Sequence, residues 1–201
     1  MTSLIAITLE EIIENEAQIL NKLFKNGLLT LHLRKPLSSE QDVYFLLSQI
    51  ASKYHDRIVL HDHFSLVNYF DLKGVHLNSR NTIRPNKVLL SVSRSCHSLD
   101  CLETSDDFNY VFLSPIFDSI SKSGYSRAFT HEELIEATNL NIITEKVIAL
   151  GGIDSDTIPI AVSYGFGGVA VLGGLWKNFK ENRDENALLE RFNKLKSICN
   201  Q

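Results

Sequence analysis

The stretch KVIALGGIDSDTIPIAVSYGFGGVAVLGG, residues 146–174, holds two short apolar runs, and each run ends in a pair of glycines. The runs are rich in Val, Ile, Leu and Ala and do not alternate with polar residues, which is typical of parallel strands buried on both faces. A helical segment near 155–163 separates them. This strand–helix–strand order predicts an α/β fold with parallel strands.

The same alternation extends through the chain in both directions. Together with the two runs above, which lie at 146–152 and 167–173, strands are expected at 4–8, 28–34, 57–62, 74–78, 88–93 and 110–117. Helices are expected at 10–27, 38–53, 131–139 and 184–199, with Ser38 as an N-cap and Gly27 as a stop. Eight such strands predict a single (β/α)8 TIM barrel over residues 1–201, and a doubly wound sheet is the competing fold.

Composition excludes several classes of protein. The chain has 201 residues, 44% of them hydrophobic, and a net charge of −4, so it lacks the basic surface that nucleic-acid binding requires. Residues 157–176 carry no charge but include Pro159 and several glycines, so we expect a buried helix and strand and no membrane span. The three cysteines, Cys96, Cys101 and Cys199, form no CxxC pair and indicate a reduced, cytoplasmic protein.

The glycine pairs suggest a phosphate site. Gly151–Gly152 follows the seventh predicted strand, and Gly173–Gly174 follows the eighth. In an α/β barrel the loops after these two strands often bind phosphate through main-chain N–H groups. The alternative is that both pairs only form tight turns.

Polar side chains gather where the predicted strands end, which in a barrel is where active sites lie. They are His32, Arg34, Lys35, His61, Asp62, His63, His76, Asn78, Arg80, Asn81, Ser93, Ser95, His97, Ser119, Ser121 and Lys122. Each has a structural alternative. His32 and His76 are equally suited to hydrogen-bonded core positions. Asp62 suits a helix cap, and Arg34 and Lys122 suit a solvated surface.

At these residues the chain resembles the thiamine phosphate synthase/TenI family. The resemblance rests on the motifs LHLRK (31–35), VLHDHFSLV (59–67), GVHL (74–77), SRSCHSLD (93–100), SPIFDSISKSG (114–124), ALGGI (149–153) and GGVAVLGGL (167–175), which occur in the family's order. It implies a (β/α)8 barrel enzyme of thiamine biosynthesis that binds a thiazole phosphate at the glycine turns.

The resemblance implies two alternative reactions. A synthase of this family joins hydroxymethylpyrimidine diphosphate to thiazole phosphate and releases diphosphate, with Mg²⁺ as its cofactor. A TenI-type thiazole tautomerase moves a proton to aromatise a thiazole carboxylate phosphate and requires no cofactor.

Departures from the synthase pattern separate the two reactions. Asp62 keeps the place of one Mg²⁺-binding carboxylate, but Asn81 fills the place of the second, so the implied metal site loses a charge. Pro36 stands where synthases have a diphosphate-binding lysine, although Lys35 is adjacent. Gly173 stands where the family has a phosphate-binding serine, which leaves the main-chain N–H groups.

The weakened metal site favours the tautomerase. In that interpretation His97 is the acid/base, and Lys122 or Arg34 contacts the substrate's carboxylate or phosphate. The predicted substrate-binding and phosphate-binding residues are His32, Lys35, Ser95, Ser119, Ser121, Gly151, Gly152, Gly173 and Gly174. The alternatives are a divergent synthase with Mg²⁺ on Asp62, and a non-catalytic binder of a phosphate ligand. The expected partners are these small molecules and a second copy of the chain in a homo-oligomer.

Overall fold

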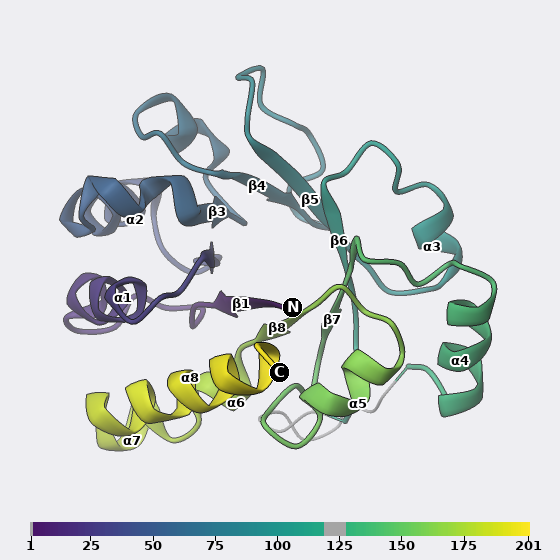
Figure 1. Ribbon diagram of the computed structural model, residues 1–201. Helices are drawn as coiled ribbons and strands as arrows, with labels where there is room; N and C mark the ends of the chain where they lie inside the picture. Colours follow the sequence, from purple (N-terminus) through teal and green to yellow (C-terminus); the bar gives the residue numbers. More distant parts are fainter. Residues whose placement is uncertain (1, 119–127) are drawn as a thin grey trace. The chain divides into compact units, whose positions relative to one another are not determined.

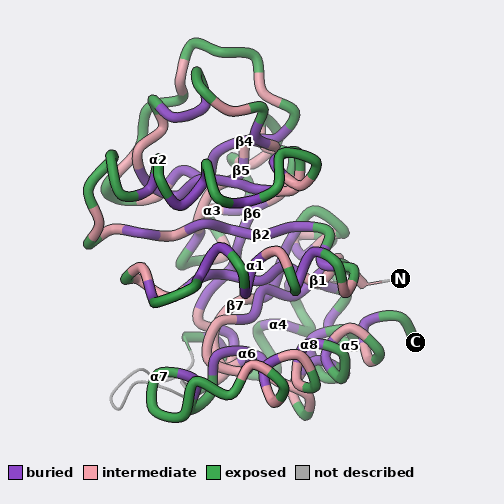
Figure 2. The backbone as a smooth tube through the Cα atoms, turned by 90° about the vertical axis from the view of Figure 1, so that its left-hand side faces the viewer, coloured by how far each residue is buried: buried purple, intermediate pink, exposed green. Residues whose placement is uncertain are grey.

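The computed structural model describes residues 2–118 and 128–201. Its eight strands form a closed barrel in the order of the sequence, which confirms the predicted (β/α)8 fold (Figure 1). The strands are β1 (Ser3–Ile7), β2 (Thr30–Leu33), β3 (Ile58–Leu60), β4 (Gly74–Leu77), β5 (Ser91–Cys96), β6 (Tyr110–Leu113), β7 (Val147–Leu150) and β8 (Gly168–Val171). Most of their residues are buried, as the purple segments of Figure 2 show.

The chain divides into two compact units, here called the N-terminal unit (residues 6–92) and the C-terminal unit (residues 1–5 and 93–201). The N-terminal unit holds helices α1 (Glu16–Lys25) and α2 (Glu40–Gln49) and the 3₁₀ helices η1 (Ser52–Arg57) and η2 (Phe64–Asn68). The C-terminal unit holds α3 (Asp100–Glu103), α4 (His131–Asn139), α5 (Ile158–Ser163), α6 (Gly173–Trp176), α7 (Phe179–Asn182) and α8 (Glu185–Cys199). That residues 1–201 form one domain stays a prediction.

In the N-terminal unit, β2, β3 and β4 are parallel neighbours, with Leu31 opposite Ile58 and Val59 opposite Gly74. A Cβ atom on Gly74 would lie 1.7 Å from the carbonyl oxygen of Ser91, so only glycine fits this contact. Parallel strands end at the same edge of their sheet, and the polar residues after β2, β3 and β4 therefore share that edge.

In the C-terminal unit, β5 to β8 pair in parallel, with Cys96 opposite Leu113 and Leu113 opposite Ala149. Helix α8, yellow in Figure 1, packs against α5 and α6. Its buried residues include Leu188 and Phe192, which are removed from water completely. Because these strands are parallel, the ends of β5, β6, β7 and β8 share one edge of the sheet.

Several predicted boundaries differ from the observed ones. Ser39, not Ser38, caps α2, because its hydroxyl accepts from the Asp42 N–H and Asp42 accepts in return. The fifth strand lies at Ser91–Cys96 and not at 88–93. Val88 and Leu90 are 96% and 75% exposed, whereas the serines Ser91 and Ser93 point into the core.

The first helix begins later than predicted. Asn15 adopts a left-handed conformation with φ of 58°, and α1 starts at Glu16. The Glu16 side chain accepts from the Ile13 N–H at 3.0 Å, which holds the turn that precedes the helix. Gly27 ends the helix as expected, with a φ of 96°.

Among the described residues, no helix combines the length and apolar character needed to cross a membrane. The uncharged stretch at 157–176 forms α5, β8 and α6, which agrees with the predicted buried helix and strand.

Candidate active site

The turn after β7 brings the main chain unusually close to the turn after β6. Gly151 and Gly152 have φ values of 97° and 63°, which favour glycine. A Cβ atom on Gly152 would lie 2.4 Å from the carbonyl oxygen of Asp118, and one on Gly151 would lie 2.8 Å from Cα of Pro115. Glycine is therefore required at both positions for the two turns to pack.

The turn after β8 packs against the turn after β7. A Cβ atom on Gly174 would lie 2.4 Å from the carbonyl oxygen of Ile153. Gly173 begins α6, so the N–H groups of Gly173 and Gly174 belong to a first helical turn, which has no carbonyl partner within its own helix. The structure thus brings both glycine pairs together, while their binding of phosphate stays a prediction.

His97 is an exposed residue directly after β5, and its ring is held by the end of β6. Its Nδ1 lies 3.0 Å from the carbonyl oxygen of Ser114 and 3.2 Å from the Ser114 hydroxyl. Since a carbonyl oxygen only accepts, Nδ1 carries the proton in this contact. In the neutral imidazole Nε2 is then the basic nitrogen.

The segment that holds His97 also contacts the glycine turns. Ser114 is followed by Pro115 through a cis peptide bond, and Pro115 packs on Gly151. The N–H of Ile116 donates to the Leu150 carbonyl at 3.0 Å. His97 and both glycine pairs therefore lie at the same edge of the C-terminal unit's strands.

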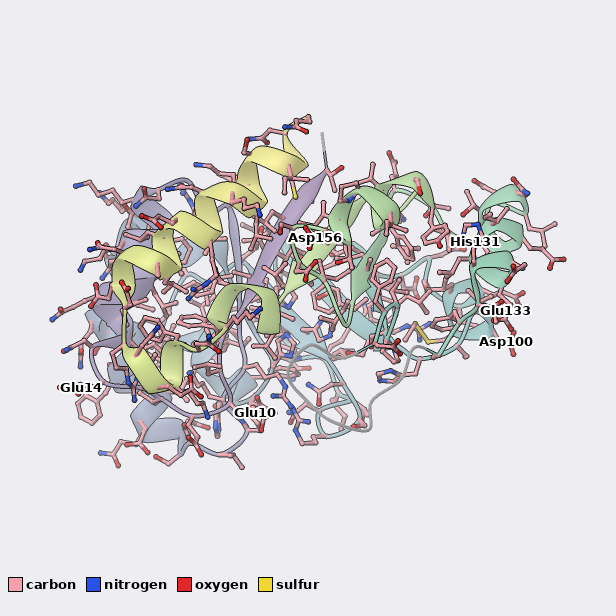
Figure 3. The ribbon with its side chains drawn as sticks, turned by 90° about the horizontal axis from the view of Figure 1, so that it is seen from below. Glu10, Glu14, Asp100, His131, Glu133 and Asp156 are labelled. Carbon is pink, nitrogen blue, oxygen red and sulfur yellow. A yellow bond between two sulfur atoms is a disulfide. The ribbon has the colours of Figure 1, made fainter. Side chains whose placement is uncertain are left out.

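A disulfide between Cys96 and Cys101 closes the loop that carries His97, and Figure 3 shows it as a yellow bond between the two sulfur atoms. The prediction that these cysteines are reduced was wrong, because their Cα atoms lie 5.6 Å apart, within disulfide range. Cys199 is a buried free thiol, and burial raises its pKa to about 11.

In the N-terminal unit, hydrogen-bond donors surround the Asp62 carboxylate. Oδ2 accepts from the Lys35 main-chain N–H at 3.1 Å. Oδ1 accepts from Arg80 Nη2 and from Asn81 Nδ2, each at 3.2 Å. The guanidinium of Arg80 takes the place of a positively charged metal ion beside the carboxylate. Asn81 points an N–H group toward it, where Mg²⁺ would require an oxygen ligand. This arrangement therefore does not fit the Mg²⁺ ion that the family resemblance implies.

Lys35 occupies a structural position and not the predicted phosphate-binding one. Its side chain is 1% exposed, and Nζ lies 2.6 Å and 2.8 Å from the two carboxylate oxygens of Glu16. Nζ also donates to the carbonyl oxygens of Leu9 at 2.9 Å and Glu11 at 2.7 Å. An ammonium group has three N–H donors, and these contacts engage them. Burial nevertheless raises the pKa of Glu16, because desolvation outweighs the attraction of Lys35.

The other predicted ligands fall into two groups. Arg34 is partly exposed and forms an ion pair with Glu10, with 2.8 Å between Nη1 and Oε1, and Ser95 lies in β5 opposite Phe112. Ser119, Ser121 and Lys122 lie outside the described residues. The roles predicted for all five stay predictions.

Sequence reasoning missed two of these contributors, Ser114 and Glu16. Their roles depend on contacts between distant segments, and no local pattern signals them. Arg80 was named among the polar residues at the strand ends, and its contact with Asp62 is added by the structure.

Three histidines of the N-terminal unit, here called the histidine cluster, meet in its core. His32, His61 and His76 are 0%, 5% and 0% exposed, which places His32 and His76 in the core positions that the sequence left as an alternative. His32 Nδ1 and His61 Nε2 are 2.7 Å apart, and the rings of His61 and His76 stack with centroids 4.3 Å apart. Burial lowers the pKa of His76 to about 3 and lowers the pKa values of His32 and His61 well below the usual 6.5.

These lowered pKa values predict that acid destabilises the folded protein. Below about pH 6.5 the unfolded chain binds protons on these imidazoles and the folded chain does not, so the free energy of unfolding falls as the pH falls toward 3. For His76 alone the loss between pH 7 and pH 5 is about 2 kcal/mol, since one pKa unit corresponds to about 1.36 kcal/mol. Urea unfolding at both pH values measures it, and a His76→Gln variant is expected to lose less. Equal losses in the two proteins would contradict the assignment.

Residues 4–175 match the family model described as thiamine monophosphate synthase. The chain belongs to the thiamine monophosphate synthase family. The match begins in β1 and ends in α6, so it takes in all eight strands and both glycine turns of the family barrel.

Comparison with individual proteins finds relatives whose names belong to the same family. The crystal structure of thiamine phosphate pyrophosphorylase from Bacteroides thetaiotaomicron superimposes with a TM-score of 0.89 at 41% identity, over 100% of this chain and 98% of that chain. A thiamine-phosphate synthase of Limosilactobacillus reuteri is 27% identical over 141 residues, which cover 65% of this chain and 64% of the relative's length. A thiamine-phosphate synthase of Proteus mirabilis is 26% identical over 174 residues, which cover 78% of this chain and 77% of the relative's length.

Proposed function

We propose that this member of the thiamine monophosphate synthase family is a thiazole tautomerase-like enzyme, and that His97 transfers the proton. One observation carries the proposal. The Ser114 carbonyl holds the proton of His97 on Nδ1, and this leaves Nε2 as a base at the same edge of the strands as the glycine turns that would hold the substrate's phosphate.

The proton transfer needs only one histidine. Nε2 removes a proton from a ring carbon of the non-aromatic thiazole, and the electron pair of that C–H bond enters the ring. A ring double bond shifts to the carbon that carries the exocyclic double bond, and the ring becomes aromatic. The electron pair of the exocyclic double bond then forms the bond between the outer carbon and the proton that the imidazolium returns. Atoms and charge balance without an oxidant, a reductant or a metal ion.

The glycine turns suit an anionic group. Main-chain N–H groups bind phosphate where a glycine-rich turn leads into a helix, because the backbone approaches the ligand without a side chain between them. Gly173 and Gly174 begin α6 and meet that description, and the turn at Gly151 and Gly152 packs beside the turn that holds them. Arg34, Ser95, Ser119, Ser121 and Lys122 remain proposed ligands of the substrate's phosphate or carboxylate.

A divergent synthase is the second candidate, and the names of the relatives favour it. The Bacteroides thetaiotaomicron relative is described as a thiamine phosphate pyrophosphorylase and shares 41% of its residues with this chain. Synthase chemistry would require a cation to neutralise the departing diphosphate. At Asp62 the charge comes instead from Arg80, which is why the tautomerase is preferred.

Two assays on the same preparation test the proposal. In the first, the protein receives the non-aromatic thiazole carboxylate phosphate in the presence of a chelator, and we expect the aromatic isomer to appear. In the second, it receives hydroxymethylpyrimidine diphosphate, thiazole phosphate and Mg²⁺, and we expect no thiamine phosphate above the uncatalysed rate. Robust synthase turnover without isomerisation would overturn the proposal. Binding of thiazole phosphate without either reaction would instead support a non-catalytic binder.

A further inference from the structure

The histidine cluster gathers three nitrogen ligands in a small buried volume. His32 lies on β2, His76 lies on β4 and His61 directly follows β3. One ring nitrogen from each residue lies within 4.8 Å of the other two. All three belong to the N-terminal unit, where neighbouring parallel strands fix their positions. Such preorganisation by rigid elements is what a binding site requires.

The three rings contact one another directly, with centroids 4.3–5.2 Å apart. One proton joins His32 Nδ1 to His61 Nε2 at 2.7 Å, while the third ring, His76, stacks on His61 with an angle of 20° between the planes. Among the residues that the structure describes, no Asp, Glu or Cys joins the group. The cluster is therefore a set of imidazole ligands alone, in surroundings that exclude bulk water.

We propose that His32, His61 and His76 together bind one divalent transition-metal ion of the Zn²⁺ class. Imidazole nitrogen suits Zn²⁺, Co²⁺ and Ni²⁺ and does not suit Mg²⁺, which prefers oxygen. With Zn–N bonds of about 2.0–2.1 Å, tetrahedral ligands are about 3.3 Å apart. That spacing lies between the 2.7 Å contact of the closest pair and the 4.8 Å limit of the group.

Metal binding requires a tautomer change, a separation of the closest nitrogens from 2.7 Å to about 3.3 Å, and a turn of one stacked ring, because an imidazole donates its lone pair in the ring plane. The proton between His32 Nδ1 and His61 Nε2 moves to the other ring nitrogen of the residue that carries it, and both freed nitrogens then donate a lone pair to the metal. With three histidine ligands, a water molecule takes the fourth position of a tetrahedral site. The ion would join β2, β3 and β4 and stabilise the folded N-terminal unit, because it binds the folded state preferentially.

This site is separate from the proposed tautomerase chemistry. It uses none of the glycine turns and does not involve His97, and it lies in a different unit from both. Isomerase activity and metal binding can therefore succeed or fail independently.

Spectroscopy with Co²⁺ on the untagged, chelator-treated full chain tests the proposal. We expect one Co²⁺ per chain with the intense visible absorption of tetrahedral cobalt, displacement of that signal by Zn²⁺, and a higher melting temperature with either ion. In His61→Asn we expect Zn²⁺ affinity to fall by at least about 100-fold, because changes in outer-shell partners alone cost about 10–100-fold.

His63→Asn is the matched control. His63 lies two residues away in the same unit and contacts the Ser38 carbonyl oxygen, and its φ of 54° is one that asparagine tolerates. This variant is expected to bind Co²⁺ as the parent protein does. X-ray absorption at the zinc edge of the parent protein, which needs no variant to fold, is expected to show three imidazole ligands. Octahedral Co²⁺, fewer than three imidazoles, or equal affinity in the two variants would overturn the proposal.

Discussion

Replacing His97 by glutamine is expected to lower the kcat/KM of isomerisation by about 10²–10⁴-fold, the usual contribution of a general acid/base. Glutamine keeps a polar group of similar length beside Ser114 but cannot take up a proton. Because His97 is exposed, the change is expected to alter the free energy of unfolding by no more than about 0.5 kcal/mol. The loss would therefore be chemical and not structural.

Two measurements on variants with intact folding check this assignment. Calorimetry with thiazole phosphate is expected to show unchanged affinity in His97→Gln, since the phosphate is assigned to the glycine turns. His131→Gln serves as the control. His131 is an exposed histidine at the start of α4, and its Nδ1 contacts the Tyr164 hydroxyl, as His97 Nδ1 contacts the Ser114 hydroxyl. If His97→Gln retained parental kcat/KM, another residue would have to carry the proton.

Replacing Lys35 by methionine is expected to lower the free energy of unfolding by about 3–5 kcal/mol, the usual effect of leaving one member of a buried ion pair unpaired. The variant leaves the Glu16 carboxylate 2% exposed without its cation. It also removes the donor that holds the carbonyl oxygens of Leu9 and Glu11. Urea unfolding at pH 7 measures the change.

A double-mutant cycle separates the ion pair from the other contacts of Lys35. The amide of Glu16→Gln can still accept from the Ile13 N–H, so this variant removes the charge and keeps that hydrogen bond. Lys35→Met combined with Glu16→Gln is expected to be more stable than Lys35→Met alone, since no buried charge is then unpaired. If Lys35→Met lost thiazole phosphate affinity while its stability stayed unchanged, the phosphate-binding role expected from the sequence would be correct after all.

The fold was predictable because most of its strands have a recognisable local sequence pattern. Runs such as 110–117 and 167–173 are apolar and short, and each contains one of the observed strands. The fifth strand was misplaced because its inward positions are the serines Ser91 and Ser93, while apolar Val88 and Leu90 face solvent. The late start of α1 was hidden because it involves Glu16, whose carboxylate holds the turn before the helix and contacts a lysine 19 residues away.

The candidate site was predictable only where position in the barrel decides it. His97 and the glycine pairs follow strands, and the structure places them at one edge because parallel strands end together. Whether a polar side chain lies on the surface or in the core depends on contacts between distant segments. The contact of Lys35 with Glu16 is of this kind, which explains why the sequence predicted that Lys35 binds the substrate's phosphate. The disulfide between Cys96 and Cys101 was also not predicted from the sequence, because the spacing of the two cysteines matches no familiar motif.

The ammonium group that ties Leu9, Glu11 and Glu16 to the end of β2 constrains how this barrel can diverge. An insertion or deletion between β1 and α1 would pull two carbonyl groups and one carboxylate away from their shared cation. Homologues that vary the length of this connection must therefore give up the lysine and the glutamate together, and homologues that keep the pair must also keep the length.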